Sequence, residues 1–156
     1  MQGPPLQLFS FPSGARLDPS ANMMQGMIVK NMSFKVGQTL TLVGTAKPEA
    51  SHFAVNIGDE TDITIHMNPR FDHEGDQNTV VCNSCQGGSW CEEQRETCFP
   101  FQQGEEFKIS ITFNPSDFLV SFTDGSSFSF PNRMEKDKYS VINVDGDARI
   151  TGIEIK

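Results

Sequence analysis

The chain has 156 residues, which is enough for one domain with a substantial hydrophobic core. It carries 12 Lys and Arg against 20 Asp and Glu, a formal net charge of −8. Nucleic acids and anionic membrane surfaces are bound through cationic faces, so neither is an expected partner. The sequence has no run of 18 apolar residues, and insertion into a bilayer is not expected either.

The first 22 residues differ in composition from the rest of the chain. They contain several prolines and scattered Gly, Ser and Gln, and they show neither helical nor strand periodicity. Residues 1–22 are therefore predicted to form a flexible N-terminal tail, and residues 23–156 a single domain. The apolar cluster from Leu6 to Phe11 is short and interrupted by polar residues, so it does not read as a secretory signal.

All four cysteines, Cys82, Cys85, Cys91 and Cys98, fall within 17 residues. A domain of this size does not need disulfides, so reduced thiols in the cytosol are the expected state. The C-x2-C spacing makes a structural zinc site an alternative. Such sites usually combine two short Cys or His motifs that are separated by a longer loop. We therefore expect neither a metal nor another cofactor. Cys85 and Cys91 are predicted to be exposed thiols near Trp90, where oxidation would disturb the adjacent turn.

From Met27 onward the hydrophobic pattern is that of short strands separated by turns. Between Phe107 and Phe113 every odd position is apolar and every even position polar, which is typical of a strand with one buried face. Turn-forming pairs such as Asp124-Gly125 separate about ten or eleven such strands, and no amphipathic helix is predicted. The pattern predicts an all-β fold in which two antiparallel sheets pack face to face, a sandwich or jelly roll.

The segment from Ile63 to Arg70 combines an apolar face with a polar one. Its apolar side chains share one parity, and His66, Asn68 and Arg70 share the other. If the strand continues to Arg70, these three groups lie in a row, about 7 Å between neighbours. A solvated outer face is the ordinary interpretation of such a row. A binding site is favoured here by further polar and aromatic residues nearby in the sequence: Asn83, Trp90, Glu93 and Arg95.

These seven side chains form a coherent set for a sugar or another small polar ligand. Sugar hydroxyls both donate and accept hydrogen bonds, and amide, imidazole, guanidinium and carboxylate groups together supply both roles. An indole face suits the apolar C–H patch of a sugar ring. Glu93 and Arg95 lie two residues apart, and we predict that they join Arg70 in an ion-pair array that holds the polar groups in place.

Three motifs occur in order along the chain: H-x-N-P-R at 66–70, V-x-N at 81–83 and W-x-x-E-x-R at 90–95. Supporting stretches lie at 99–104, 130–133 and 146–147. From Gly26 to Lys156 the chain therefore resembles the galectins, the β-galactoside-binding lectins.

The resemblance implies a jelly-roll sandwich of about five and six strands, with the sugar in a groove on the concave face. It implies calcium-independent binding of β-galactosides such as lactose and N-acetyllactosamine, without catalysis. It also implies a homodimer joined through the terminal strands at 27–29 and 150–155, which would cross-link glycoproteins. Galectins occur in the cytoplasm and, by export without a signal peptide, outside the cell, and the same is expected here.

Carried over by position, the resemblance implies which sugar hydroxyl each residue contacts. His66, Asn68 and Arg70 would hydrogen-bond the axial 4-hydroxyl of galactose, and Asn83 and Glu93 would bind its 6-hydroxyl. Glucose has an equatorial 4-hydroxyl, which would leave buried donors and acceptors unpaired.

The resemblance also implies which residues contact the second sugar, which residue stacks under the galactose ring and which lies in the core. Arg70, Glu93 and Arg95 would reach the neighbouring sugar. Trp90 would stack under the galactose ring, and Cys82 would point into the core.

One position departs from the family pattern. Galectins often have a His eight residues after the first His of the motif, whereas this chain has Glu74, preceded by His73. Glu74 is predicted to act beyond galactose, in an extended part of the site. The alternative is that Glu74 pairs with Arg70 or Arg95 and supports the site.

Two other function classes are alternatives. A glycosidase on the same kind of sandwich would need two carboxylates about 5–10 Å apart, one of them kept protonated by an apolar site. Glu74, Asp76 and Glu93 are candidates, but the arginines near Glu93 would hold it ionised. An intracellular protein–protein module is the other alternative, as an addition to sugar binding.

Overall fold

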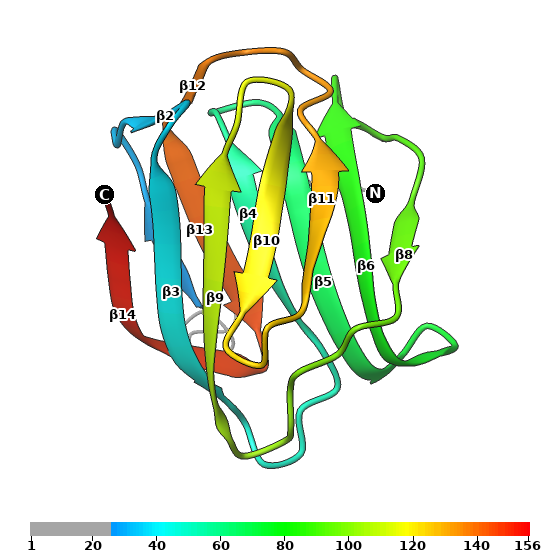
Figure 1. The fold of residues 1–156 in the computed structure, drawn as a ribbon. Coiled ribbons are helices and arrows are strands. Elements are labelled where there is room, and N and C mark those ends of the chain that lie inside the picture. Colours follow the sequence, from blue (N-terminus) through cyan, green and yellow to red (C-terminus); the bar gives the residue numbers. More distant parts are fainter. Residues whose placement is uncertain (1–25) are drawn as a thin grey trace, which may run out of the picture.

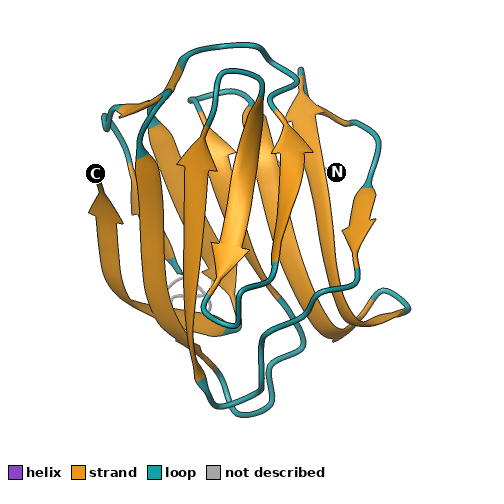
Figure 2. Cartoon of the chain, viewed as in Figure 1, coloured by secondary structure: helices purple, strands orange, loops and turns teal. Residues whose placement is uncertain are grey.

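The computed structural model describes residues 26–156, so the predicted tail at 1–22 lies outside the described residues. This part of the chain forms fourteen strands. Figures 1 and 2 show no helix in it, and hence no helix in it could cross a membrane. The strands are β1 (Met27–Val29), β2 (Phe34–Lys35), β3 (Thr39–Ala46), β4 (Phe53–Gly58), β5 (Ile63–His73), β6 (Asp76–Gln86), β7 (Ser89–Trp90), β8 (Gln94–Glu96), β9 (Glu106–Phe113), β10 (Asp117–Phe122), β11 (Ser127–Pro131), β12 (Lys138–Tyr139), β13 (Val141–Gly146) and β14 (Ala148–Ile155).

Two antiparallel sheets pack face to face (Figure 1). The larger has seven strands, ordered β1-β13-β4-β5-β6-β7, with β8 also paired to β6. The smaller has five strands, ordered β11-β10-β9-β3-β14. Because β7 and β8 pair with different stretches of one edge of β6, the larger sheet has six strand positions. The predicted all-β sandwich is confirmed, and β2 and β12 add a small separate ribbon.

Aromatic rings fill the space between the sheets. The ring of Phe113 stacks on Phe118 with centroids 4.7 Å apart, and Phe53 stacks on Phe107 at 4.9 Å. The odd-numbered residues of β9 are buried and the even-numbered ones are not, as the period-two pattern predicts. Cys82 is fully buried in this core, which confirms the inward orientation expected for it.

The hairpin of β5 and β6 carries most of the predicted site. Its turn consists of Glu74 and Gly75, whose φ angles are 54° and 84°. Positive φ at both central residues is the geometry of a type I′ turn, whose twist matches that of the flanking strands. The turn pairs His73 with Asp76. The carboxylate of Asp76 then lies within hydrogen-bonding distance of Arg70 on the other strand of the hairpin.

Candidate functional site

The outer face of the larger sheet, turned away from the core, carries a groove of about 810 Å³. Six of the seven predicted site residues line it, together with Glu74. Arg95 does not line it but is hydrogen-bonded to Glu93, which does. The lining residues are His52, Ala54, His66, Asn68, Arg70, His73, Glu74, Val81, Asn83, Trp90, Cys91, Glu93 and Asp145. A second groove of about 730 Å³, between the β5–β6 hairpin and residues 99–103, contains none of the predicted site residues.

Strand register brings the polar side chains of the groove into transverse rows. His66 lies opposite Asn56 on β4 and Asn83 on β6. Arg70 lies opposite His52 on one side and Thr79 on the other. The predicted row on β5 is therefore the middle of a wider polar surface, to which β4 contributes residues that the sequence motifs do not include.

His66 is held by hydrogen bonding and by an aromatic contact. Its Nδ1 lies 2.6 Å from Oδ1 of Asn56, and its ring lies 4.8 Å from that of Trp90, tilted by 56°. Burial, followed by the charges of Arg70 and His52, lowers the pKa of His66 to about 3. The imidazole is therefore neutral at physiological pH.

Asn68 and Arg70 form a connected pair. Asn68 donates through Nδ2 to the carbonyl oxygen of Phe53 at 2.7 Å, and the same nitrogen lies 3.2 Å from Nδ1 of His52. Its Oδ1 accepts a hydrogen bond of 2.9 Å from Nε of Arg70. This arrangement fixes both side chains and leaves further N–H groups of the guanidinium for other partners.

Asp76 joins the two arginines of the site. It accepts hydrogen bonds from Nη1 of Arg70 at 2.7 Å and from Nη2 of Arg95 at 3.0 Å. These hydrogen bonds, from Arg95 first, lower the pKa of Asp76, so its carboxylate stays charged. Glu93 accepts a hydrogen bond of 2.9 Å from Nη1 of Arg95. The predicted ion-pair array exists, but Asp76 rather than Glu93 links Arg70 to it.

Glu74 lies at the rim of the groove. Its side chain is 68% exposed, and its Oε1 lies 4.0 Å from Nε2 of His73. Within residues 26–156 no ion pair joins Glu74 to Arg70 or Arg95, so the alternative in which Glu74 pairs with one of these arginines is wrong. The turn explains the difference, because Glu74 occupies the tip of the hairpin and Asp76 is the carboxylate that returns to the sheet.

Asn83 is oriented by contacts on both sides of its amide. Its Nδ2 donates to the carbonyl oxygen of Cys91 at 3.1 Å, and its Oδ1 accepts from the backbone N–H of Ser84 at 2.7 Å. The guanidinium of Arg133 lies 4.7 Å from the ring centroid of Phe130 and also donates to Oδ1 of Asn83, at 3.3 Å. The amide therefore has one N–H left to donate into the groove.

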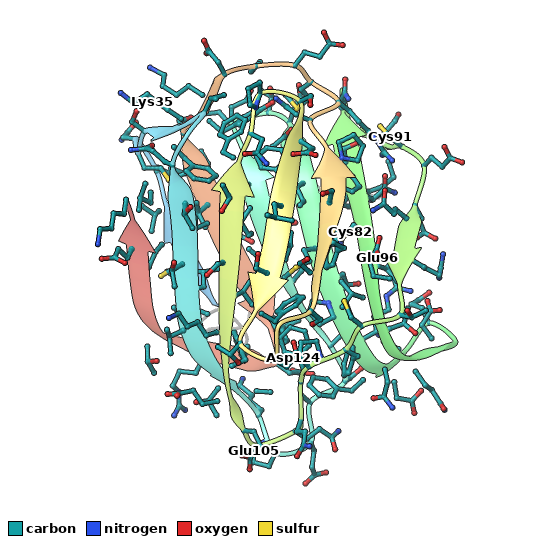
Figure 3. The ribbon with its side chains drawn as sticks, in the orientation of Figure 1. Lys35, Cys82, Cys91, Glu96, Glu105 and Asp124 are labelled. Atoms are coloured by element: carbon teal, nitrogen blue, oxygen red, sulfur yellow. The ribbon has the colours of Figure 1, made fainter. Side chains whose placement is uncertain are left out.

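Trp90 is positioned by the short strand β7. Gly87 and Gly88 have φ angles of 60° and 85°, and they turn the chain so that Trp90 pairs with Cys85 of β6. Cys91 is exposed, as predicted, and Figure 3 shows it on the segment between β6 and β8. The prediction that Cys85 is exposed is wrong. Cys85 is fully buried because β5 and β7 flank it, and burial raises its pKa to about 11.

The polar residues in or beside the groove that the sequence did not assign to any site include His52, Asn56 and Asp145. Asp76 was predicted only as a candidate carboxylate of a glycosidase, and the structure pairs it with both arginines. Burial raises the pKa of Asp145 to about 6, and the ring of His52 stacks on that of His73 with centroids 3.7 Å apart. His52, Ala54 and Asn56 alternate along the chain, so they lie on one face of β4 and its N-terminal extension. This two-residue spacing is the sequence signal that could have predicted His52 and Asn56 as neighbours of the site. Asp145 could be assigned only from the pairing of β13 with β4.

The fold and the groove together define a β-sandwich protein with a polar ligand site beside one tryptophan. A family model described as galactoside-binding lectin matches residues 25–155. The β-galactoside-binding lectin of Electrophorus electricus is 49% identical over 134 residues, covering 85% of this chain and 99% of that protein. Galectin-1 of Sus scrofa is 42% identical over 129 residues, covering 82% and 96%.

Solved structures agree with the sequence comparisons. Galectin-1-L2 of Dario rerio superposes with a TM-score of 0.81 at 55% identity, covering 83% of this chain and 98% of that one. The ancestral congerin Con-anc superposes with a TM-score of 0.82 at 40% identity, covering 84% and 100%. The chain belongs to the galactoside-binding lectin family. It is a carbohydrate-binding protein and not an enzyme, which settles the glycosidase alternative.

Proposed function

We propose that the chain binds lactose and N-acetyllactosamine-type glycans in the groove on the outer face of the larger sheet, without calcium. The observation that carries the proposal is the convergence of hydrogen-bond donors and acceptors from β5 and β6 beside Trp90. In this proposal galactose occupies the part of the groove between His66, Arg70 and Trp90. The neighbouring sugar lies towards Arg95.

The 4-hydroxyl of galactose is the selective contact in this proposal. An axial 4-hydroxyl can donate to the neutral imidazole of His66 and accept from a free N–H of Arg70, while Oδ1 of Asn68 offers a further acceptor. An equatorial hydroxyl, as in glucose, leaves these groups unpaired after they lose water. Each such unpaired group costs about 1–3 kcal/mol.

The 6-hydroxyl and the ring face complete the galactose site. Asn83 has one amide N–H to donate to the 6-hydroxyl, and Glu93 has a carboxylate oxygen that Arg95 does not use. The half-buried indole of Trp90 supplies a flat apolar surface for the C–H groups of the ring. Arg70, Glu93 and Arg95, tied together by Asp76, offer donors and acceptors to the second sugar, and Glu74 lies near an extended part of the site.

Calcium independence is supported by the state of the carboxylates in the groove. Asp76 is paired with Arg70 and Arg95, and Glu93 with Arg95. A cation would have to displace these arginines to obtain its oxygen ligands.

Titration calorimetry tests the function directly. We expect lactose to bind with equal affinity in calcium and in EDTA, and cellobiose, which differs from lactose only in having glucose in place of galactose, to bind at least tenfold more weakly. Equal affinity for the two disaccharides would contradict the assignment of the 4-hydroxyl. Loss of lactose binding in EDTA would contradict calcium independence.

We further propose that two copies associate through the terminal strands and cross-link glycoproteins. β1 and β14 are the edge strands of the two sheets, and edge strands have unpaired backbone groups that favour association. Ile28 and Ile153 on these strands are exposed by 44% and 39%. Light scattering should give the mass of a dimer at micromolar concentration, and Ile153→Asp should give a monomer that still binds lactose. A monomeric mass for the unmodified chain would contradict this proposal.

The proposed locations are the cytoplasm and the extracellular space. The buried free thiols of Cys82 and Cys85 support folding in a reducing compartment. Fractionation of cells that express the tagged chain would test this, with tagged protein expected in both the cytosol and the medium. Confinement to secretory vesicles would contradict the proposal.

A further inference from the structure

A hydrogen-bonded chain of three side chains runs across the larger sheet and ends at His66, which lines the groove. Asn143 on β13, Asn56 on β4 and His66 on β5 lie directly opposite one another in the strand register. Nδ2 of Asn56 donates to Oδ1 of Asn143 at 3.3 Å, and Oδ1 of Asn56 lies 2.6 Å from Nδ1 of His66. Asn56 is fully buried, so its amide must find its partners inside the protein.

The chemistry of the amide sets the direction of these hydrogen bonds. An asparagine side chain has one oxygen that only accepts and one nitrogen that only donates. Because the nitrogen of Asn56 faces Oδ1 of Asn143, its oxygen faces His66. The His66 nitrogen on that side must therefore carry the proton. A neutral imidazole has a single N–H, so Nε2 is left with a lone pair.

We infer that Asn56 is a positioning residue that holds His66 in its Nδ1–H tautomer, so that Nε2 acts only as a hydrogen-bond acceptor towards the ligand. The inference rests on the proposed function, which it deepens. Arg70 beside the ring supplies donors only. A hydroxyl placed between Nε2 and Arg70 can therefore both donate and accept. In the other tautomer it would face two donors, and its own O–H would be left with only Oδ1 of Asn68, which already accepts from Arg70, as an acceptor.

The surroundings of the ring favour the neutral form on which this tautomer depends. The titratable and charged side chains whose fields act on His66 are Arg70 on β5 and His52 next to β4, and both oppose a positive charge. β6 presents the neutral amide of Asn83 opposite the ring, and β7 presents the indole of Trp90. The interaction that chooses between the two neutral tautomers is thus the hydrogen bond to Asn56.

The test begins with the unmodified protein and no sugar. Long-range proton–nitrogen NMR spectra of ¹⁵N-histidine-labelled protein distinguish a protonated ring nitrogen from an unprotonated one. For His66 we expect a protonated Nδ1 and an unprotonated Nε2 across the neutral pH range. The opposite pattern, or rapid exchange between the two tautomers, would overturn the inference without any variant having to fold.

Asn56→Asp extends the test to binding. A carboxylate facing Nδ1 raises the pKa of His66, and the imidazolium that forms donates from Nε2 and cannot accept. Lactose affinity of this variant should fall about tenfold for each pH unit below the raised pKa, whereas that of the unmodified chain should show no such fall from His66. An Asn56→Asp protein whose His66 resonances and lactose affinity follow those of the unmodified chain at every pH would overturn the inference.

Asn143→Asp is the matched control. It adds the same charge one residue farther along the hydrogen-bonded chain, where it still accepts from Asn56, so the tautomer of His66 should not change. A changed tautomer in this control would overturn the assignment to Asn56. If His66 shows the stated tautomer and the unmodified protein does not bind lactose, the proposed function fails and the effect of Asn56 on the ring stands.

Discussion

The imidazole rings of His52 and His73 stack at the edge of the groove, with centroids 3.7 Å apart and planes 19° apart. Burial lowers the pKa of His52 and so does the nearby His73, and these effects outweigh the opposing charges of Asp147 and Glu74. The folded protein therefore binds a proton at His52 less readily than the unfolded chain does.

This relationship predicts a pH dependence of stability. A histidine whose pKa is lowered by folding stabilises the fold fully above its unfolded pKa, near 6.5. That stabilisation is lost as the pH falls from there towards the folded pKa, with a slope of at most about 1.4 kcal/mol per pH unit for one proton. In urea titrations at several pH values, His52→Gln should reduce the slope below pH 6.5. Parallel curves for the variant and the unmodified chain would contradict the assignment.

Asp145 acts in the opposite direction over part of this range. Its pKa is raised to about 6 by burial, so it favours the fold at low pH and loses that effect as the pH rises from about 4 to 6. Because Asp145 is present in both proteins, the comparison with His52→Gln isolates the histidine.

Replacing Trp90 by Leu should weaken lactose binding while the protein stays folded. Leu retains hydrophobic surface but has no flat face for the C–H groups of a sugar. Loss of an aromatic stacking surface costs about 1–3 kcal/mol, which corresponds to an affinity about 5- to 160-fold lower. Titration calorimetry measures the change, and circular dichroism controls for folding. Retention of the folded variant on a lactose column with unchanged affinity would contradict the role of Trp90.

Replacing Asp76 by Asn should lower lactose affinity by about tenfold, because Arg70 and Arg95 lose charge-assisted hydrogen bonds of roughly 1.5–3 kcal/mol and with them their fixed orientation. Asp72→Asn is the matched control. It removes the same charge from the same hairpin, where Asp72 borders the second groove and not the one with the predicted site. Calorimetry at two salt concentrations is the measurement, and equal affinity of the two variants would contradict the bridging role of Asp76.

Glu74→His should raise the relative affinity for anionic lactosides. Glu74 is largely exposed at the rim, where its charge repels a sulfate or sialic acid at 4 Å by about 1 kcal/mol in water. The ratio of affinities for sialylated and plain lactose should therefore rise a few-fold in the variant, as measured on both ligands under the same conditions. An unchanged ratio would show that Glu74 plays no part in selecting extended glycans.

Alkylation of Cys91 should inhibit lactose binding. Its thiol is exposed next to Trp90, and its carbonyl oxygen accepts the hydrogen bond that orients Asn83. Burial raises the pKa values of Cys82 and Cys85, so these thiols should react slowly. Iodoacetamide followed by peptide mass spectrometry should find Cys91 modified first, and Cys91→Ser should keep its affinity under the same treatment. Unchanged affinity of the Cys91-alkylated chain would contradict this prediction.

The sequence by itself determined the all-β class, the faces that the longer strands present and the family. It predicted about ten or eleven strands, whereas residues 26–156 form fourteen, several of them only two or three residues long. The alternation of polar and apolar residues is a local property, so the common face of His66, Asn68 and Arg70 and the burial of Cys82 could be read from parity alone. The motifs at 66–70, 81–83 and 90–95 were sufficient for the family, and the structure places them on β5, on β6 and on the segment from β7 to β8, whose two strands both pair with β6.

Only the tertiary structure decided which side chains meet across strands. Asp76 joins Arg70 to Arg95 because a two-residue turn returns it to the sheet, and Asn56 reaches His66 because β4 pairs with β5 in one particular register. Cys85 has the parity of Asn83, which lines the groove, yet it is fully buried between its strand partners Ile63 and Trp90. Parity specifies the face on which a side chain lies, but its partners depend on the pairing of strands, which is a property of the whole sheet.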